Sequence, residues 1–164
     1  MRNTLLAMIG LMLVCVSGVA HAAPGDERWV SMNPEIPGTD GVIEVMVQQG
    51  DYLYIGGSFS VVKNIAANNI AYLHVPSGTW SALGNGISGS VEALAVDENG
   101  TVYAGGQFTM AGGVTANHVA KWDGTEWSVL GTGIGEASDG YPQVHALALD
   151  ENGDLYLGGW FTKA

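Results

Sequence analysis

The first stretch that could carry chemistry is Gly84-Asn85-Gly86-Ile87-Ser88-Gly89, which satisfies the G-x-G-x-x-G pattern of dinucleotide-binding loops. That fingerprint must open a helix and be followed by a distant acidic residue. Here a strand-like segment, residues 91–96, comes next, and the corresponding stretch 131–136 lacks the third glycine. We therefore interpret both stretches as loops between structural repeats and expect no bound cofactor.

A second candidate is the acidic run 150–154, Asp-Glu-Asn-Gly-Asp, which presents oxygen ligands at alternate positions as calcium loops do. A calcium loop also needs a glycine at its sixth position and a distal glutamate, where this chain has Leu155 and Phe161. We predict a hairpin turn. The chain has no H-E-x-x-H or G-x-S-x-G motif and its histidines lack metal-ligand spacing, so the sequence indicates neither a metal site nor catalytic residues.

Residues 1–22 have the pattern of a secretory signal peptide. Arg2 precedes an apolar run over residues 5–19, and Ala20-His21-Ala22 has the small residues that a signal peptidase recognises. A membrane anchor is disfavoured because the run is shorter than the roughly 20 residues that span a bilayer. A lipoprotein would use Cys15, but Val14 precedes it where a small residue is expected. We expect export to the periplasm, the cell surface or the medium.

The charge balance narrows the possible partners. Once Arg2 leaves with the leader, four Lys/Arg face sixteen Asp/Glu, a net charge of −12. Such a field repels phosphate backbones and anionic lipids, so we expect neither nucleic-acid nor direct membrane binding. Cys15 is the only cysteine, which leaves the exported part without disulfides.

One apolar stretch with a glycine pair occurs three times, as residues 53–59, 102–108 and 155–161, with the pairs 49 and 53 residues apart. Without gaps, residues 91–111 match residues 144–164 at 14 of 21 positions. This period is typical of blade-type repeats. The residues expected to define the repeat are Gly56, Gly57, Phe59, Gly105, Gly106, Phe108, Gly158, Gly159 and Phe161, together with Trp80 and Trp127.

Each repeat is predicted to form four short strands without helix. In the second repeat these are residues 91–96, the glycine-pair strand, residues 117–122 after a small-residue loop at 110–115, and a strand around Trp127. The fold class is therefore an all-β propeller of four-stranded antiparallel blades. The repeats cover 42–90, 91–143 and an incomplete 144–164, about two and a half blades, after a lead-in at 23–41 that holds a possible ring-closing strand near Trp29. We expect a fragment of a longer propeller, or further copies, to close the ring.

Glycine inside a strand costs roughly 0.5–1 kcal/mol relative to alanine, so a repeated pair needs a compensating reason. We predict close approach of a neighbouring blade at the glycines, with the repeated phenylalanines filling the space between blades.

The pattern Val-Tyr-Ala-Gly-Gly-Gln-Phe-Thr, followed by Ala-Asn-His-Val-Ala-Lys-Trp-Asp-Gly and Trp-Ser-Val-Leu-Gly, resembles the delta-sixty type of bacterial β-propeller repeat. It is similar more loosely to kelch repeats and to the propeller of fungal cortical polarity markers. The resemblance covers residues 29–164 and implies a propeller, but these families span many functions.

The candidate binding residues lie in predicted loops. The connection after Ile134 is six residues longer than the one after Ile87. We expect an exported, non-enzymatic module for protein or glycan recognition. Alternatives are a propeller enzyme, oxidase-like or glycan-active, whose catalytic residues lie in other blades, and a structural spacer. The candidate ligand contacts are Glu136, Asp139 and Tyr141 in the longer connection, and Asn68 and Asn117 in the loops between the second and third strands.

Overall fold

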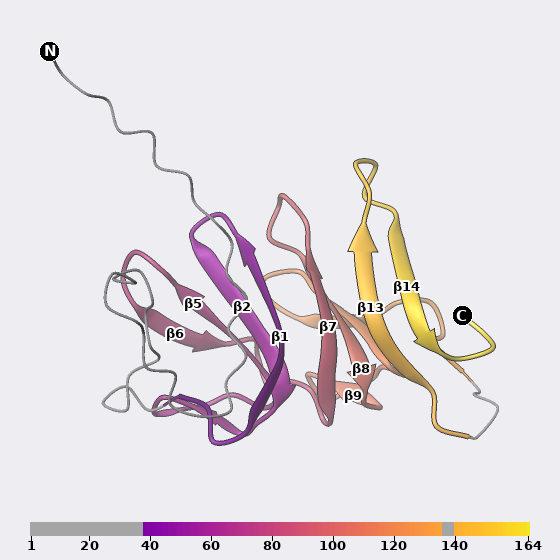
Figure 1. Ribbon diagram of the computed structural model, residues 1–164, viewed down its shortest axis with the longest axis horizontal. Coiled ribbons are helices and arrows are strands. Elements are labelled where there is room, and N and C mark those ends of the chain that lie inside the picture. The colour runs from indigo at the N-terminus through magenta and orange to yellow at the C-terminus, as the bar shows by residue number, and fades with distance from the viewer. Residues whose placement is uncertain (1–37, 136–139) are drawn as a thin grey trace, which may run out of the picture. The chain divides into compact units, whose positions relative to one another are not determined.

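The computed structural model describes residues 38–135 and 140–164, all within one compact unit, Met32–Ala164. Two four-stranded antiparallel sheets are followed by a two-stranded one (Figure 1). Blade 1 has the strand order β1 (Val42–Gln49), β2 (Tyr52–Ser58), β5 (Ile70–His74), β6 (Thr79–Ala82). Blade 2 has the order β7 (Ser90–Val96), β8 (Val102–Gln107), β11 (Val119–Trp122), β12 (Trp127–Val129), and blade 3 pairs β13 (Gln143–Leu149) with β14 (Leu155–Trp160).

This architecture confirms the predicted fold class, about two and a half blades of an all-β propeller. No helix occurs in the described ranges. A search of those same residues for an apolar helix that could cross a membrane also found none.

The predicted loop at 110–115 is instead a two-stranded ribbon, which corrects the sequence interpretation. β9 (Met110–Ala111) pairs with β10 (Val114–Thr115), and blade 1 has the same ribbon in β3 (Val61–Val62) and β4 (Ile65–Ala66). The third strand of blade 2 begins at Val119 rather than at Asn117, because His118 has a left-handed φ of 63° that is incompatible with a strand.

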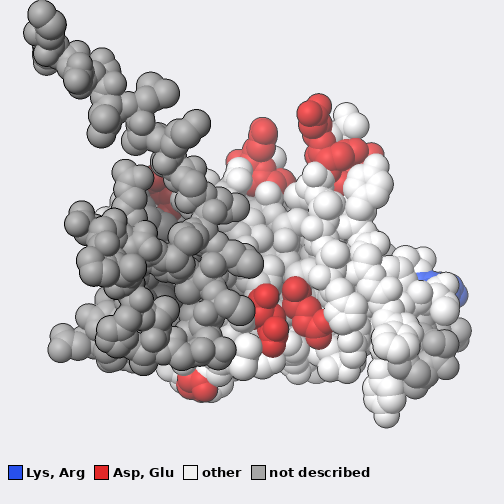
Figure 2. All heavy atoms as spheres, viewed as in Figure 1, with Lys and Arg blue, Asp and Glu red and all other residues white. Residues whose placement is uncertain are grey.

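The acidic run in blade 3 forms the predicted hairpin turn. The carboxylate of Asp150 accepts the N–H groups of Asn152 and Asp154, both at 2.9 Å, and Gly153 has a φ of 83°. The backbone N–H of Asp154 is the main cause that lowers the pKa of Asp150 below its ordinary 3.8. Figure 2 shows acidic side chains gathered at the tips of the β7–β8 and β13–β14 hairpins.

The glycine pair permits two close approaches, as predicted. A Cβ at Gly56 would lie 2.5 Å from Cγ1 of Val91 on β7, and a Cβ at Gly105 would lie 2.5 Å from Cγ1 of Val144 on β13. The second glycine of each pair faces the bulge in the first strand of its own blade, where a Cβ would overlap backbone atoms. Glycine is therefore needed at both positions in blades 1 and 2, whereas in blade 3 only Gly159 is constrained in this way.

The main core lies between blades 1 and 2. Phe108 and Trp127 are 3% and 5% exposed in this cluster, and the indole N–H of Trp127 donates to the carbonyl of Leu83 at 2.8 Å, which joins the outer strand of blade 2 to the end of blade 1. The buried members of the cluster are Tyr54, Ile70, Leu83, Ile87, Val91, Leu94, Val102, Ala104, Phe108, Ala111, Ala116, Ala120 and Trp127.

We expect Gly105→Ala to destabilise the fold by roughly 1–3 kcal/mol, because the new methyl group would overlap Val144. The matched control is Gly158→Ala, since a Cβ there meets only Cβ of Ala146, at 3.6 Å. Urea denaturation measures both free energies of unfolding. Equal losses for the two variants would contradict the assigned contact.

Phe108→Ala should cost about 3–5 kcal/mol, since it removes a buried aromatic ring and leaves a cavity between the blades. The measurement is the midpoint of thermal unfolding followed by circular dichroism. A midpoint equal to that of the unaltered chain would rule out the packing role of Phe108.

Candidate functional site

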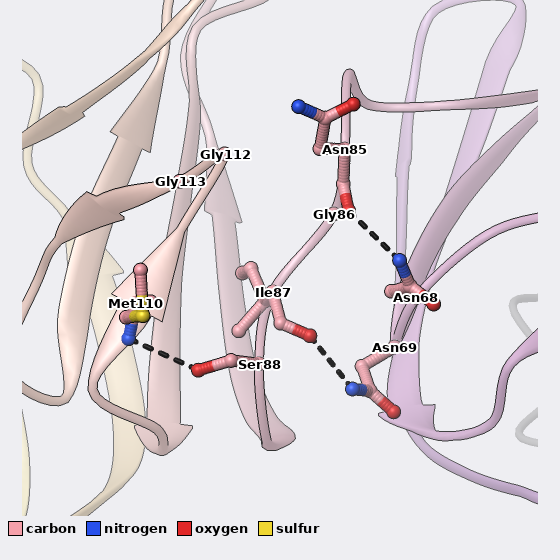
Figure 3. A pocket seen from close by; sticks show the side chains of 9 residues that line it. All are labelled: Asn68, Asn69, Asn85, Gly86, Ile87, Ser88, Met110, Gly112 and Gly113. Atoms are coloured by element: carbon pink, nitrogen blue, oxygen red, sulfur yellow. Dashed lines mark hydrogen bonds between the residues drawn. The ribbon is translucent and has the colours of Figure 1, made fainter.

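A pocket of about 390 Å³ lies between blades 1 and 2 (Figure 3). It lies at the end of the blades where the second strand connects to the third and where one blade passes to the next, the lower end in Figure 1. We call this end the loop face; it comprises residues 59–69, 83–89, 108–118 and 130–135. The lining residues are Asn68, Asn69, Asn85, Gly86, Ile87, Ser88, Met110, Gly112 and Gly113.

Two adjacent asparagines of blade 1 hold one wall of the pocket. Nδ2 of Asn68 donates to the carbonyl of Asn85 at 3.0 Å, and Nδ2 of Asn69 donates to the carbonyl of Ile87 at 2.7 Å. Oδ1 of Asn69 also accepts the N–H of Phe59 at 2.9 Å, and its φ of 64° places it in the left-handed region that asparagine tolerates. These bonds fix the connection between the blades against the loop before β5.

The opposite wall comes from the ribbon of blade 2. The N–H of Met110 donates to Oγ of Ser88 at 3.1 Å, and the N–H of Ser88 donates to the carbonyl of Met110 at 2.9 Å. Gly112 N–H donates to the carbonyl of Gly86 at 2.8 Å, and the Met110 side chain remains 42% exposed. Amide, hydroxyl and thioether groups thus surround the pocket, so it can combine hydrogen bonds with apolar contact.

The same connection recurs between blades 2 and 3, with a different lining. Nδ2 of Asn117 donates to the carbonyl of Thr132 at 3.3 Å, and Ile134 N–H donates to the carbonyl of Asn117 at 2.9 Å. The pocket there has about 490 Å³, and Asn117 does not line it. Its side chains are mainly apolar, from Val119, Leu130, Ile134, Leu155 and Leu157.

The glycine-rich stretch 84–89 is the connection between β6 and β7, which confirms its interpretation as a loop between repeats. Gly86 has a φ of 74°, and a Cβ there would lie 2.4 Å from the carbonyl oxygen of Asn68, so no larger residue fits. Among the described residues, no group of three or more acidic, histidine or cysteine side chains could hold a metal ion.

The structure does not bring the predicted ligand contacts that it describes together in one pocket. Asn68 lines the pocket, whereas Asn117 takes the equivalent position one blade further on. Tyr141 is 67% exposed just before β13. Glu136 and Asp139 lie outside the described residues.

Among the residues that line the pocket, sequence reasoning singled out Asn68 alone as a ligand contact; the side chains that it missed are those of Asn69, Asn85, Ile87, Ser88 and Met110. Aligning the repeats points to the connections at 84–89 and 131–136 as partners of the asparagine loops. The sequence does not indicate that residues 110–113 line the same pocket as Asn68. Residues 110–115 are predicted as a loop, and the pairing of β9 with β10 is therefore not expected.

Asn69→Ala should destabilise the fold by about 2–3 kcal/mol, because the N–H of Phe59 loses its acceptor and alanine must adopt a left-handed conformation. Asn85→Ala is the control, since only the backbone carbonyl of Asn85 accepts the Asn68 bond. Chemical denaturation of the two variants tests this. Similar stabilities would contradict the bracing role of Asn69.

Comparison with known proteins gives a match to a family model. The family model described as the Rax2 C-terminal beta propeller domain matches residues 27–136, which is two thirds of the chain and includes both complete blades. Searches of curated proteins and of solved structures gave no match. The match agrees with the resemblance to fungal polarity-marker propellers and does not extend to bacterial or kelch-like repeats. Together with the blades, it shows that the chain belongs to the Rax2 C-terminal beta propeller family.

Proposed function

We propose that this chain is an exported, non-enzymatic recognition module that binds a protein or a glycan through its loop face, at the cell surface or outside the cell. The β-propeller supports a recognition or structural role, because it holds loops of different sequence on a rigid frame. The leader pattern at residues 1–22 supports the export step.

The observation that carries the proposal is the pocket between blades 1 and 2. Its volume of about 390 Å³ lies within the range of roughly 300–1,000 Å³ typical of ligand sites. Side chains of Asn68, Asn85 and Ser88 supply polar groups, and Met110 supplies an adaptable apolar surface. Amide and hydroxyl groups suit ligands rich in hydroxyl or peptide groups, which describes glycans and extended peptides.

The charge distribution favours the loop face over the opposite end. Acidic residues cluster at the hairpin tips, where Figure 2 shows them over blades 2 and 3. The described part of the loop face holds Lys63, in the turn between β3 and β4, and next to that ribbon the carboxylate of Asp40, which accepts the N–H groups of Ser60 and Val61; Lys163 lies just after β14. A neutral or acidic ligand therefore meets less repulsion at the loop face.

The test is a binding screen of the purified chain on a glycan array and on a panel of exported proteins, followed by Met110→Glu. A carboxylate in the pocket should lower the affinity for a binder found in the screen by at least about tenfold, because the charge is buried on binding without a partner.

Val129→Glu is the matched control. Val129 is 44% exposed on the outer strand β12 and does not line the pocket, while Met110 is 42% exposed. Equal binding by the two variants, with both folded, would remove the pocket from the proposal.

A further inference from the structure

Four aromatic rings lie side by side on the face of blade 1 that packs toward blade 2, and we call them the aromatic cluster. Its members are Tyr52, Tyr54, Tyr72 and His74. β2 supplies the first two and the neighbouring strand β5 supplies the others, in the cross-strand pairs Tyr52 with His74 and Tyr54 with Tyr72. Because alternate residues of a strand point to the same side, all four rings share one face of the sheet.

The aromatic cluster extends from the core to the surface. Tyr54 is 8% exposed in the core between blades 1 and 2, Tyr72 is partly buried beside it, and Tyr52 is 41% exposed. Tyr52 begins β2 and His74 ends β5. The exposed part of the cluster therefore lies at the end of blade 1 opposite to the loop face, the upper end in Figure 1.

The neighbouring rings hold Tyr52 in place. Its ring centroid lies 5.7 Å from that of Tyr72 at an interplanar angle of 73°, which is an edge-to-face arrangement. It lies 5.1 Å from the imidazole of His74 and 6.4 Å from the ring of Tyr54. All three distances fall in the range of roughly 4.5–7 Å at which aromatic pairs attract. A ligand that contacts the exposed side of Tyr52 thus meets a ring that is already ordered, so binding costs little side-chain entropy.

The exposed rings belong to blade 1 and are not part of the repeat. Tyr54 occupies a position that is tyrosine in all three repeats, and it serves the packing of the blades. The other three positions are polar in blade 2, where Thr101, Lys121 and Asp123 stand in place of Tyr52, Tyr72 and His74. Blade 2 forms the same four strands with these polar residues. The frame therefore does not require aromatic rings there, and an exposed aromatic surface that packing does not require is typical of a binding site.

Hydrogen-bonding groups adjoin the exposed rings. Oγ of Ser77 lies 2.7 Å from Nδ1 of His74 and donates to Oγ1 of Thr79 at 2.9 Å. Ser77 and Thr79 are both exposed, in the turn from β5 and at the start of β6. The platform thus combines a flat apolar ring with hydroxyl groups at its edge.

The geometry of the rings limits the class of ligand. Their centroids are 5.1–6.4 Å apart, so the rings contact one another and leave no space between them for a cation. A ligand must lie flat on the outer side of Tyr52. One tyrosine side chain supplies at most about 250 Å² of contact. A stable protein interface needs about 800 Å² on each partner, which disfavours a protein as the ligand.

A sugar ring has the matching chemistry. It presents a face of C–H groups that packs on an aromatic ring, and hydroxyl groups around its edge that bond to polar side chains. The net charge of −11 repels an anionic sugar. A neutral sugar is not repelled, even beside the acidic hairpin tips at this end of the blades.

We propose that the aromatic cluster of blade 1 is a carbohydrate-binding platform, on which a ring of a neutral polysaccharide stacks against Tyr52 and bonds to Ser77 and Thr79 at its edge. The platform lies at the opposite end of the blade from the pocket of the loop face. It is a second site, and it does not rest on the proposed function of that pocket.

The experiment is affinity electrophoresis of the full chain, expressed with its leader and purified, in native gels that contain a soluble β-glucan, a galactomannan or a xylan. We expect at least one of the three polysaccharides to retard the unaltered chain. Tyr52→Thr should weaken this binding by at least about tenfold, because the stacking surface is lost. The variant should fold, since threonine stands at the same position of blade 2. Tyr52→Phe keeps the ring and should bind like the unaltered chain.

Tyr156→Thr is the matched control. It removes a tyrosine that is 60% exposed on β14, outside the aromatic cluster, and should leave the retardation unchanged. Met110→Glu separates the two sites, because it alters the pocket of the loop face and leaves the platform intact. It should be retarded like the unaltered chain. Thermal midpoints of all variants show that each is folded.

Four results would each overturn the proposal. These are a mobility that none of the three polysaccharides changes, binding that survives Tyr52→Thr, binding that Tyr52→Phe loses, and an equal loss in Tyr156→Thr. Retardation that Met110→Glu abolishes and Tyr52→Thr does not would assign the sugar to the loop face instead. The opposite pattern would support the platform and leave the loop face to be tested by its own screen.

Discussion

The contact between a valine of one blade and a glycine of the blade before it is the constraint on which the rest of the structure depends. At 2.5 Å from the place of a missing Cβ, the valine methyl group leaves no room for any other residue. The second glycine of the pair is equally constrained by the bulge beside it. The contact at the first glycine sets how closely neighbouring sheets pack, and the apolar cluster around Phe108 and Trp127 fills the space that remains between blades 1 and 2.

The loop face follows from this packing. Because the blades are held close at the glycines, the connection from one blade to the next must turn sharply, and glycines such as Gly86, with a φ of 74°, allow it. The side-chain amides of Asn68 and Asn69 then donate hydrogen bonds to backbone carbonyl groups of this connection, which lies outside the strands. The pocket is what this arrangement leaves between the asparagine loop, the connection and the ribbon of the next blade.

The broad faces of the blades and the loop face differ in how closely the repeats resemble one another. The broad faces of the blades are apolar and pack against neighbouring blades. The loop face varies between repeats, with Asn69 where the next repeat has His118, and with a polar pocket where the next connection has an apolar one. A frame of repeated contacts with variable loops is how propellers of one family acquire different ligands.

The sequence by itself determined the repeat, the strands and the glycine positions. A period of about fifty residues, alternating apolar residues and Asp-Glu-Asn-Gly turns are local signals, and local sterics govern them. Only the tertiary structure decided which residues share a pocket: Met110 and Asn68 lie 42 positions apart and meet because two blades pack together. It also decided that Asn68 and Asn117 serve as braces as well as loop residues, and that residues 110–115 form a ribbon. The physical reason is that hydrogen bonds between blades depend on the distance between the packed sheets. The pattern of residues along one strand does not specify that distance.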